Sequence, residues 1–353
     1  MTARCCPDEQ PVPDTYRGGA GGGHPTSFGV HESERVIAVV EDDFPSTALL
    51  TPHAGVRYVF IGHGSPAPRE ALQADAVFTW DPSDPFLRDN WSRLTNLRWV
   101  HASSAGVDRL LFTELVDSDV VLTSSRYVFD TALAEYVIGM MLMMSKDLGA
   151  TLLFQREHRW VRRESDTLHG KVAVLVGVGP IARQVARFAT AFGMVVHGIG
   201  RTARADDPDF GDITTPDTMQ TLFAVADYVV MVLPKTPATE KLVDAPALAA
   251  LQPSARLINV GRAWSLDQDA LVRALRDGRL AAAALDVVTP EPLPADDPLW
   301  DTPNLFISPH MSGDHRGWQA DIAKLFDINL ELWLRGEPLR NVIDKRLGYA
   351  PGH

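Results

Sequence analysis

Cysteine is nearly absent from this sequence, which has 353 residues and only two cysteines, Cys5 and Cys6. The two cysteines are adjacent and lie in a polar segment, so they provide no disulfide framework. A chain without such a framework is typical of a reducing compartment, and we expect a cytoplasmic protein. Residues 1–10 contain no apolar core, so no secretory signal is expected.

Long apolar runs and excess positive charge are also lacking. The longest apolar stretch, residues 132–144, carries Glu135 and is shorter than the roughly 20 residues that a membrane-spanning helix needs. It therefore predicts a buried or interfacial helix rather than a membrane span. The 33 Lys and Arg residues against 45 Asp and Glu give a formal net charge of -12. This balance argues against nucleic acid or an anionic membrane as a partner, although local arginines could still bind a small anion.

The chain is long enough for two domains. Residues 1–33 are rich in Gly, Pro and polar residues and cannot bury enough apolar surface to offset the entropy of ordering, so we expect a disordered extension. From Arg35 onward, short β-branched runs alternate with helix-compatible segments, which predicts parallel sheets. Strands are expected at 35–40, 56–60, 76–80, 98–101 and 120–123, and then at 171–176, 195–198, 228–232, 256–259, 282–286 and 305–307.

Two helices organise these strands into domains. A long helix at 131–148 is expected to connect the two sets, and an amphipathic helix at 321–335 to return to the first domain, because the second sheet is already complete. The predicted fold class is α/β, with two Rossmann- or flavodoxin-like parallel-sheet domains. We place the dinucleotide-binding domain at 131–315, inserted into a substrate domain at 34–130 and 316–345, with a cleft between the two lobes.

A glycine turn follows the strand at 171–176 and opens a helix. Gly177 permits the tight turn, Gly179 lets the backbone approach a pyrophosphate, and the small Ala182 allows close packing of helix and strand. The helix N-terminus offers free N–H groups to phosphates. The turn therefore predicts a dinucleotide site that includes Gly177, Gly179, Pro180 and Ile181.

The next strand carries the signal for cofactor choice. NAD-specific sites usually place an acidic residue about 20 positions after the glycine turn. Here Arg201 stands in that place, with Thr202 and Arg204 beside it, and guanidinium groups bind a 2′-phosphate that a carboxylate would repel. We therefore expect NADP as the preferred cofactor, with NAD possible if these arginines are merely solvated. Asp206 and Asp207 come several residues later and are expected in a loop.

Seven separate motifs follow one another in a characteristic order. They are Ser103-Ser104-Ala105-Gly106-Val107-Asp108, Ala134-Glu135, the Gly177 turn, Leu233-Pro234, Asn259-Val260-Gly261-Arg262, Asp286-Val287-Val288-Thr289-Pro290-Glu291-Pro292-Leu293 and Ser308-Pro309-His310. Over about Arg35 to Asn341 the chain thus resembles the D-isomer-specific 2-hydroxyacid dehydrogenases. The resemblance implies a catalytic set of arginine, glutamate and histidine, which are Arg262, Glu291 and His310 here. It also implies a homodimer. The apolar residues 136–144 could form part of the dimer interface, or they could pack in the core of their own domain.

The reduction of a 2-oxoacid requires a hydride at the carbonyl carbon and a proton at its oxygen. His310 is the natural proton donor, and Glu291 would hold the imidazole and favour its charged form. Arg262 would bind the substrate carboxylate and polarise the carbonyl. We expect the others of the 11 histidines to be exposed or structural.

The resemblance implies further contacts with substrate and cofactor. Ala105, Gly106 and Val107 would present backbone N–H groups to the substrate carboxylate, or form an ordinary glycine turn. Trp80 could wall the substrate pocket or pack in the core. Further cofactor contacts are expected from Leu233, Pro234, Val260, Gly261 and Asp286. The leucine and proline would pack against the adenine, and the aspartate would hydrogen-bond the nicotinamide carboxamide.

The sequence thus predicts an NAD(P)H-dependent reductase that converts a small 2-oxoacid, glyoxylate or hydroxypyruvate being favoured, into its D-2-hydroxyacid. No metal site is expected. The alternative is a nucleotide-sensing binding protein similar to the C-terminal-binding co-repressors, which share the fold and the catalytic set. Turnover of 2-oxoacids separates the two hypotheses.

Overall fold

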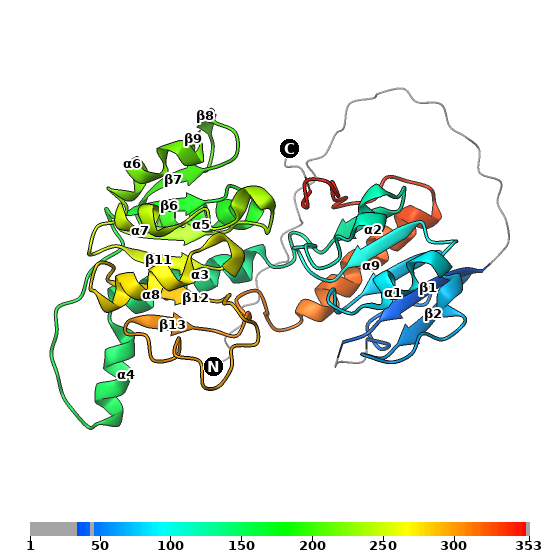
Figure 1. Cartoon of the computed structure of the whole chain (residues 1–353), viewed down its shortest axis with the longest axis horizontal. Coiled ribbons are helices and arrows are strands. Elements are labelled where there is room, and N and C mark those ends of the chain that lie inside the picture. Colours follow the sequence, from blue (N-terminus) through cyan, green and yellow to red (C-terminus); the bar gives the residue numbers. More distant parts are fainter. Residues whose placement is uncertain (1–33, 43–45, 351–353) are drawn as a thin grey trace, which may run out of the picture. The chain divides into compact units, whose positions relative to one another are not determined.

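The computed structural model describes residues 34–42 and 46–350, so the disordered extension expected at residues 1–33 lies outside the described part of the chain. Two sheets organise the described residues (Figure 1). Within these residues, no single helix is long and apolar enough to cross a membrane. The α/β class and the two parallel-sheet domains are as predicted.

The first sheet has five parallel strands in the order β2-β1-β3-β4-β5. This is the 2-1-3-4-5 order of flavodoxin-like folds. Its strands are β1 (Arg35–Val40), β2 (Val56–Ile61), β3 (Ala76–Thr79), β4 (Trp99–Ala102) and β5 (Val121–Ser124). Its short helices are η1 (Ala71–Gln73), α1 (Phe86–Asn90), η2 (Trp91–Arg93) and α2 (Thr113–Asp117). Strands β3 and β4 are buried along their whole length, as expected for parallel strands covered on both faces.

Helix α9 (Trp318–Leu334) packs on this first sheet although it follows the second sheet in sequence. The Phe326 ring stacks on Phe78 of β3 at a centroid distance of 4.4 Å and on Trp99 of β4 at 5.3 Å. This aromatic contact confirms that the predicted amphipathic helix at 321–335 returns to the first sheet.

The second sheet has eight strands in the order β13-β12-β11-β10-β6-β7-β9-β8. They are β6 (Val172–Val176), β7 (Val195–Ile199), β8 (Arg204–Asp207), β9 (Gly211–Thr214), β10 (Tyr228–Met231), β11 (Arg256–Asn259), β12 (Ala282–Leu285) and β13 (Leu305–Ile307). From β9 to β12 the strands follow the Rossmann order, and the chain direction across the sheet reverses between β6 and β10. In such sheets ligands bind beyond the carboxyl ends of the strands at this point.

Helices cover both faces of the second sheet. They are α3 (Asp130–Ser145), α5 (Pro180–Ala191), α6 (Met219–Phe223), α7 (Ala245–Ala249) and α8 (Gln268–Arg276), with the single turns η3 (Pro216–Thr218), η4 (Pro237–Thr239) and η5 (Ala263–Ser265). Helix α4 (Leu148–Arg156) has no buried residue and projects away from the sheet (Figure 1). Buried residues of α3 and α5 share one apolar cluster, and those of α7 and α8 belong to the cluster on the other face.

Two local predictions are wrong. The helix expected at 131–148 ends at Ser145, and α4 begins after Asp147 at a bend of 64°. The apolar run ends at Met144, and Asp147 adopts a left-handed φ of 49° that breaks the helix. Residues Asp206 and Asp207 lie in strand β8 rather than in a loop, because Arg183 of α5 binds the Asp207 carboxylate at 2.7 Å.

Candidate active site

The glycine turn lies between β6 and α5, as predicted. Gly177 has a φ of +106°, and a Cβ there would stand 2.6 Å from the carbonyl oxygen of Val232, so only glycine fits. Gly179 precedes the first helical residue, Pro180, and the N-terminus of α5 therefore opens at the reversal point of the sheet. The fully buried Ala182 supplies the predicted close contact between helix and sheet.

The segments that follow β10 and β11 meet at the same edge of the sheet. A Cβ on Gly261 would lie 2.5 Å from the backbone nitrogen of Leu233, so these two segments approach as closely as their backbones allow. The structure thus brings Leu233 and Pro234 together with Val260 and Gly261, four residues that were predicted to contact the cofactor.

The three residues predicted to bind a 2′-phosphate differ in their surroundings. Arg201 and Thr202 follow β7 and are exposed. Arg204 opens β8 and donates from its Nε to the Asp207 carboxylate at 3.1 Å. Among the described residues no carboxylate pairs with Arg201, whose guanidinium lies over the ring of Tyr349 at 5.6 Å. Arg201 is therefore the arginine whose charge is available to an anion.

Two of the acidic residues nearby, Asp207 and Asp209, are neutralised by arginines. Hydrogen bonds from Arg183 lower the pKa of the Asp207 carboxyl to about 2 against the opposing effect of burial. Asp209 is bound in the same way by Arg183 and Arg187, each at 2.7 Å. These pairs neutralise the carboxylates that would otherwise repel a phosphate.

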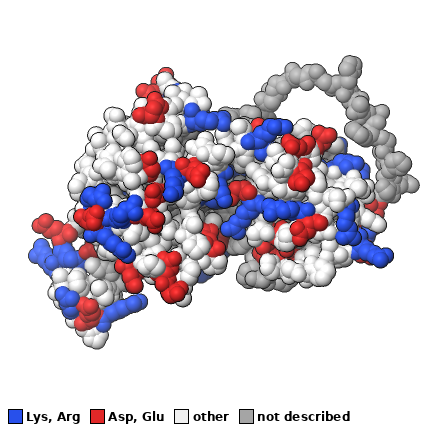
Figure 2. All heavy atoms as spheres, viewed as in Figure 1, with Lys and Arg blue, Asp and Glu red and all other residues white. Residues whose placement is uncertain are grey.

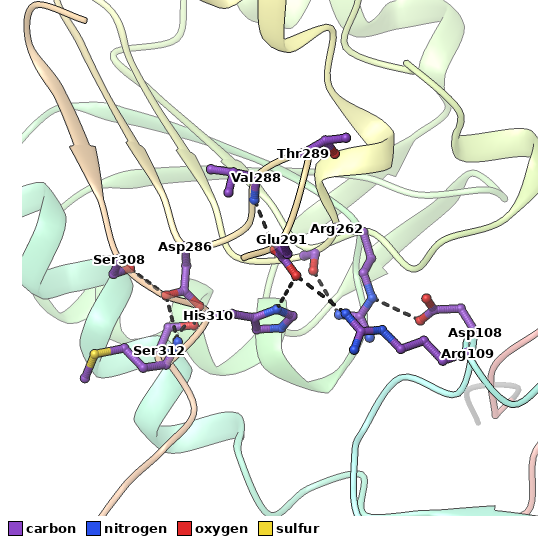
Figure 3. A network of polar contacts seen from close by, with 12 residues as sticks. Asp108, Arg109, Arg262, Asp286, Val288, Thr289, Glu291, Ser308, His310 and Ser312 are labelled. Atoms are coloured by element: carbon purple, nitrogen blue, oxygen red, sulfur yellow. Dashed lines mark hydrogen bonds and ion pairs between the residues drawn. The ribbon is translucent and has the colours of Figure 1, made fainter. Parts of the chain in front are cut away.

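His310 and Glu291 form the hydrogen-bonded pair that the sequence predicts (Figure 3). Glu291 follows β12, and His310 follows β13 with a left-handed φ of 54° and a backbone N–H donated to Asp286. The distance from His310 Nδ1 to Glu291 Oε2 is 3.1 Å. The His310 side chain is 45% exposed, and its Nε2 has no partner within the described residues, so that nitrogen is free to face a substrate.

The Glu291 carboxylate is held in its ionised form. Burial by itself raises the pKa of Glu291, but the hydrogen bond and charge of His310, the N–H of Val288 and the charge of Arg109 outweigh that effect. The net pKa is therefore below the ordinary value, and Glu291 is an anion at neutral pH. An anion beside Nδ1 stabilises an imidazolium.

Asp286 binds the loop that carries His310. Its buried carboxylate accepts hydrogen bonds from Ser308 Oγ at 2.5 Å, from the N–H of Met311 at 3.0 Å, and from both the N–H and the hydroxyl of Ser312. Ser308 also bonds the Tyr136 hydroxyl at 2.6 Å. The contacts of Asp286 orient the His310 loop, and its expected contact with the nicotinamide carboxamide stays a prediction.

Arg262 follows β11 and reaches the segment that contains Gly106. Its Nε donates to Asp108 Oδ1 at 3.0 Å and its Nη1 to the Gly261 carbonyl at 3.0 Å. A Cβ on Gly106 would lie 2.0 Å from Arg262 Nη2, so the absence of a side chain at 106 makes room for the guanidinium. The N–H groups of residues 105–107 have no acceptor within the described residues. This segment and Arg262 together offer N–H donors to an anion.

Two charged residues beside this turn carry contacts that the sequence does not predict. Asp108 binds Arg262, and the next residue, Arg109, places Nη2 3.6 Å from Glu291 Oε2 (Figure 3). Glu291 Oε2 therefore faces both His310 and Arg109. In the sequence, the only local signal for these two ion pairs is that the opposite charges of Asp108 and Arg109 stand side by side just after Gly106.

Trp80 is packed in the core of the first sheet. Its ring centroid lies 4.8 Å from that of Phe78 and 6.4 Å from that of Trp318, and only 5% of the residue is exposed. Its buried Nε1 has no partner within the described residues. Core packing, one of the two roles expected, is confirmed, and a substrate contact stays a prediction.

Comparison with known proteins gives consistent matches. Residues 138–312 match the family model of the NAD binding domain of D-isomer specific 2-hydroxyacid dehydrogenases. An (S)-sulfolactate dehydrogenase of Chromohalobacter salexigens is 31% identical, over 75% of this chain and 80% of its own. A glyoxylate/hydroxypyruvate reductase B of Pectobacterium atrosepticum is 30% identical, over 74% and 83%. The crystal structure of a D-isomer specific 2-hydroxyacid dehydrogenase from Xanthobacter autotrophicus Py2, in complex with NADPH and MES, superposes with a TM-score of 0.74 at 27% identity, over 88% of this chain and 100% of that one.

Proposed function

The chain belongs to the D-isomer specific 2-hydroxyacid dehydrogenases, a family of nicotinamide-dependent oxidoreductases, and we propose that it reduces a small 2-oxoacid to the D-2-hydroxyacid with NADPH. The observation that carries this proposal is the hydrogen bond of 3.1 Å between His310 and Glu291. A catalytic set of arginine, glutamate and histidine requires this pair. The hydrogen bond joins the loops that follow β12 and β13 at the carboxyl edge of the second sheet. The binding-protein alternative is not favoured, because the relatives are named dehydrogenases and reductases.

The residues around the glycine turn fit a dinucleotide. A Cβ on Gly179 would meet nothing within 4 Å, so this position leaves room at the N-terminus of α5 for a pyrophosphate. Gly177 lets the turn pass beside Val232 and Leu233, and the Leu233 segment in turn lies against Gly261. When bound, the reduced nicotinamide supplies the hydride. Arg201, which has no carboxylate partner within the described residues, would bind the 2′-phosphate and so favour NADPH over NADH.

The chain's own residues supply the proton and hold the substrate. His310 donates a proton from Nε2 to the substrate oxygen, while Glu291 stabilises the imidazolium that precedes transfer. Arg262 and the N–H groups of residues 105–107 bind the substrate carboxylate and polarise the carbonyl. In the reverse direction the neutral imidazole accepts the hydroxyl proton.

Glyoxylate and hydroxypyruvate are the substrates that we propose. The Pectobacterium relative is named for both, and a small 2-oxoacid needs only the carboxylate contacts that Arg262 and the Gly106 segment provide. The Chromohalobacter relative is named for (S)-sulfolactate. The 2-oxoacid that corresponds to sulfolactate is 3-sulfopyruvate, which is therefore a competing candidate substrate. The comparison of these three 2-oxoacids therefore decides the substrate class.

The experiment is a substrate panel followed at the nicotinamide absorbance. Purified protein is assayed with glyoxylate, hydroxypyruvate, 3-sulfopyruvate, pyruvate and phenylpyruvate, each with NADPH and with NADH. We expect the highest kcat/KM for glyoxylate or hydroxypyruvate with NADPH. Binding of NADPH without turnover of any 2-oxoacid would favour the binding protein instead.

We assign the domain roles as the sequence predicts them, with the cofactor on residues 131–315 and the substrate on 34–130 and 316–345. No nucleic-acid partner is proposed. On the face shown in Figure 2, basic and acidic side chains are interspersed rather than gathered in one basic patch, which suits a small-molecule substrate.

A homodimer is part of the proposal. Tyr136, Met140 and Met143 of α3 line a hollow of about 340 Å³ together with Trp300 and Phe306. Large apolar side chains on and after α4 are also exposed, among them Leu152, Leu153 and the fully exposed Trp160. Exposed apolar surface of this kind favours a protein partner, and we propose a second copy of the chain. Light scattering should give twice the 38.7 kDa of one chain, and Trp160→Asp should lower that mass.

A further inference from the structure

The last described residues of the chain are fixed to the first sheet. Val342 pairs with Thr123 of β5, and Ile343 donates its N–H to Leu122 at 2.8 Å. The ammonium of Lys345 donates to the carbonyls of Leu115, Ser118 and Val120 at 2.6–2.9 Å. Because these contacts anchor the start of the segment, residues 342–350 have a defined path.

This segment folds back on itself and presents Tyr349. The N–H of Asp344 donates to the Tyr349 carbonyl at 3.2 Å, and the N–H of Gly348 donates to the Asp344 carbonyl at 2.9 Å. Arg126 Nη1 holds the Ala350 carbonyl at 3.0 Å. Tyr349 is thus fixed by a hydrogen bond to its own carbonyl and by hydrogen bonds to the residues on both sides of it.

Tyr349 reaches the residue proposed to bind the 2′-phosphate. The Arg201 guanidinium carbon stands 5.6 Å from the Tyr349 ring centroid, within the range of a cation–π contact. A Cβ on Gly348 would be 4.0 Å from the side chain of Thr236, which follows the Leu233-Pro234 segment by two residues. The segment therefore borders two parts of the chain that are proposed to hold the adenosine end of the cofactor.

The contact between Arg201 and Tyr349 is electrostatic and is not a hydrogen bond. The guanidinium charge lies over the face of the Tyr349 ring, and Arg201 has no hydrogen-bond acceptor among the described residues. Arginine carries five N–H donors, so donors remain for a phosphate while the ring restricts the long side chain.

We propose that Tyr349 is a positioning residue for NADPH, which holds the Arg201 guanidinium over the ring so that its N–H donors meet the 2′-phosphate. This inference rests on the proposed NADPH preference. It couples cofactor choice to a segment that is anchored on the first sheet, away from the glycine turn.

The test is a pair of fluorescence titrations, with NADPH and with NADH, on the full-length chain. An exposed cation–π contact predicts that Tyr349→Ala raises the Kd for NADPH by about two- to fivefold and leaves the Kd for NADH unchanged. Tyr349→Phe keeps the ring and should keep the wild-type Kd for NADPH. Arg346→Ala is the matched control, because Arg346 lies in the same segment, is exposed and pairs with Asp117 rather than with Arg201.

A double-mutant cycle locates the effect at Arg201. In an Arg201→Ala background, Tyr349→Ala should cause no further loss of NADPH affinity. The inference is overturned if Tyr349→Ala leaves NADPH binding unchanged, weakens NADPH and NADH equally, or tightens NADPH because the ring obstructs the phosphate. A wild-type protein that binds NADH as tightly as NADPH would instead contradict the proposed cofactor preference, which is a separate outcome.

Discussion

Two histidines of this chain occupy opposite kinds of surroundings. His101 lies in β4 within the core of the first sheet, fully buried among Phe78, Trp99 and Phe326. Its Nδ1 and Nε2 contact the hydroxyls of Thr123 at 2.8 Å and Ser125 at 3.3 Å. Burial lowers the pKa of His101 to about 3, so the imidazole is neutral.

His310 has the exposure and the partner that His101 lacks. Its ring is 45% exposed and contacts the Glu291 carboxylate, with one nitrogen free of partners within the described residues. Hydroxyl partners satisfy a neutral imidazole in the core, whereas a carboxylate partner supports the charged form that proton donation requires. The partner and the exposure, not the residue type, thus distinguish the buried His101 from His310, the residue proposed as proton donor.

The largest expected effect is the loss of chemistry at His310. General acid catalysis contributes about 100- to 10,000-fold, and His310→Gln should lower kcat for 2-oxoacid reduction by that factor. The melting temperature should stay near that of the wild type, because the ring is half-exposed. Stopped-flow reduction of hydroxypyruvate under saturating NADPH measures kcat, and a loss of less than tenfold would contradict the assigned role.

The next effect concerns the glycine that makes room for Arg262. Gly106→Ala places a Cβ where Arg262 Nη2 now stands, at 2.0 Å, and so displaces the guanidinium. A displacement of about 1 Å in such a site can cost on the order of 100-fold, and we expect a fall of that size in kcat/KM. Gly62→Ala is the control, since its Cβ would meet only Ser65 Oγ at 3.3 Å. Equal activities of the two variants would contradict the proposal that the close contact between Gly106 and Arg262 positions the guanidinium.

At His101 the expected effect is on stability and not on turnover. His101 binds protons in the unfolded state below its ordinary pKa of 6.5 but in the folded state only near pH 3, so stability is lost as the pH falls below 6.5. The loss at pH 5 is about 2 kcal/mol. Urea unfolding at pH 7 and pH 5 should show a smaller difference for His101→Gln than for the wild type. Parallel pH dependence of the two proteins would contradict a buried neutral imidazole.

Asp130, in the first turn of α3, is expected to change the pH dependence of stability with the opposite sign. Burial raises the pKa of its carboxyl to about 6, although the charge of Arg126 opposes the shift. The folded state then binds the proton more tightly than the unfolded state, so stability falls as the pH rises from about 4 to 6. We expect Asp130→Asn to be more stable than the wild type by about 3 kcal/mol at pH 8, with the difference vanishing below pH 4. A variant that is less stable at pH 8 would show that the charge itself is favourable at the helix N-terminus.

Much of the fold follows from local sequence patterns. Continuous β-branched runs predict strands such as β1 and β6, and the amphipathic pattern before Arg335 predicts that α9 packs on a sheet. The strand β8 could not be predicted in this way, because Asp207 is held by Arg183, 24 residues earlier in the chain. Long-range ion pairs leave no periodic signal.

In the candidate site, too, contacts within predicted motifs could be foreseen, whereas contacts between distant residues could not. The pairing of His310 with Glu291 is found as expected, because both residues lie in motifs that follow strands of one sheet at its carboxyl edge. The contacts of Asp108 with Arg262 and of Arg109 with Glu291 join residues more than 150 positions apart, and the sequence assigns them no role. The contact of Tyr349 with Arg201 is of the same kind.

The measurement that tests the central claim most directly is the product formed from hydroxypyruvate and NADPH. Chiral chromatography of the completed reaction, with NADPH consumption followed in parallel, determines both the stoichiometry and the stereochemistry. The account predicts one D-glycerate for each NADPH oxidised by the wild type, and almost none formed by His310→Gln. L-glycerate as the product, or equal turnover by the two proteins, would contradict it.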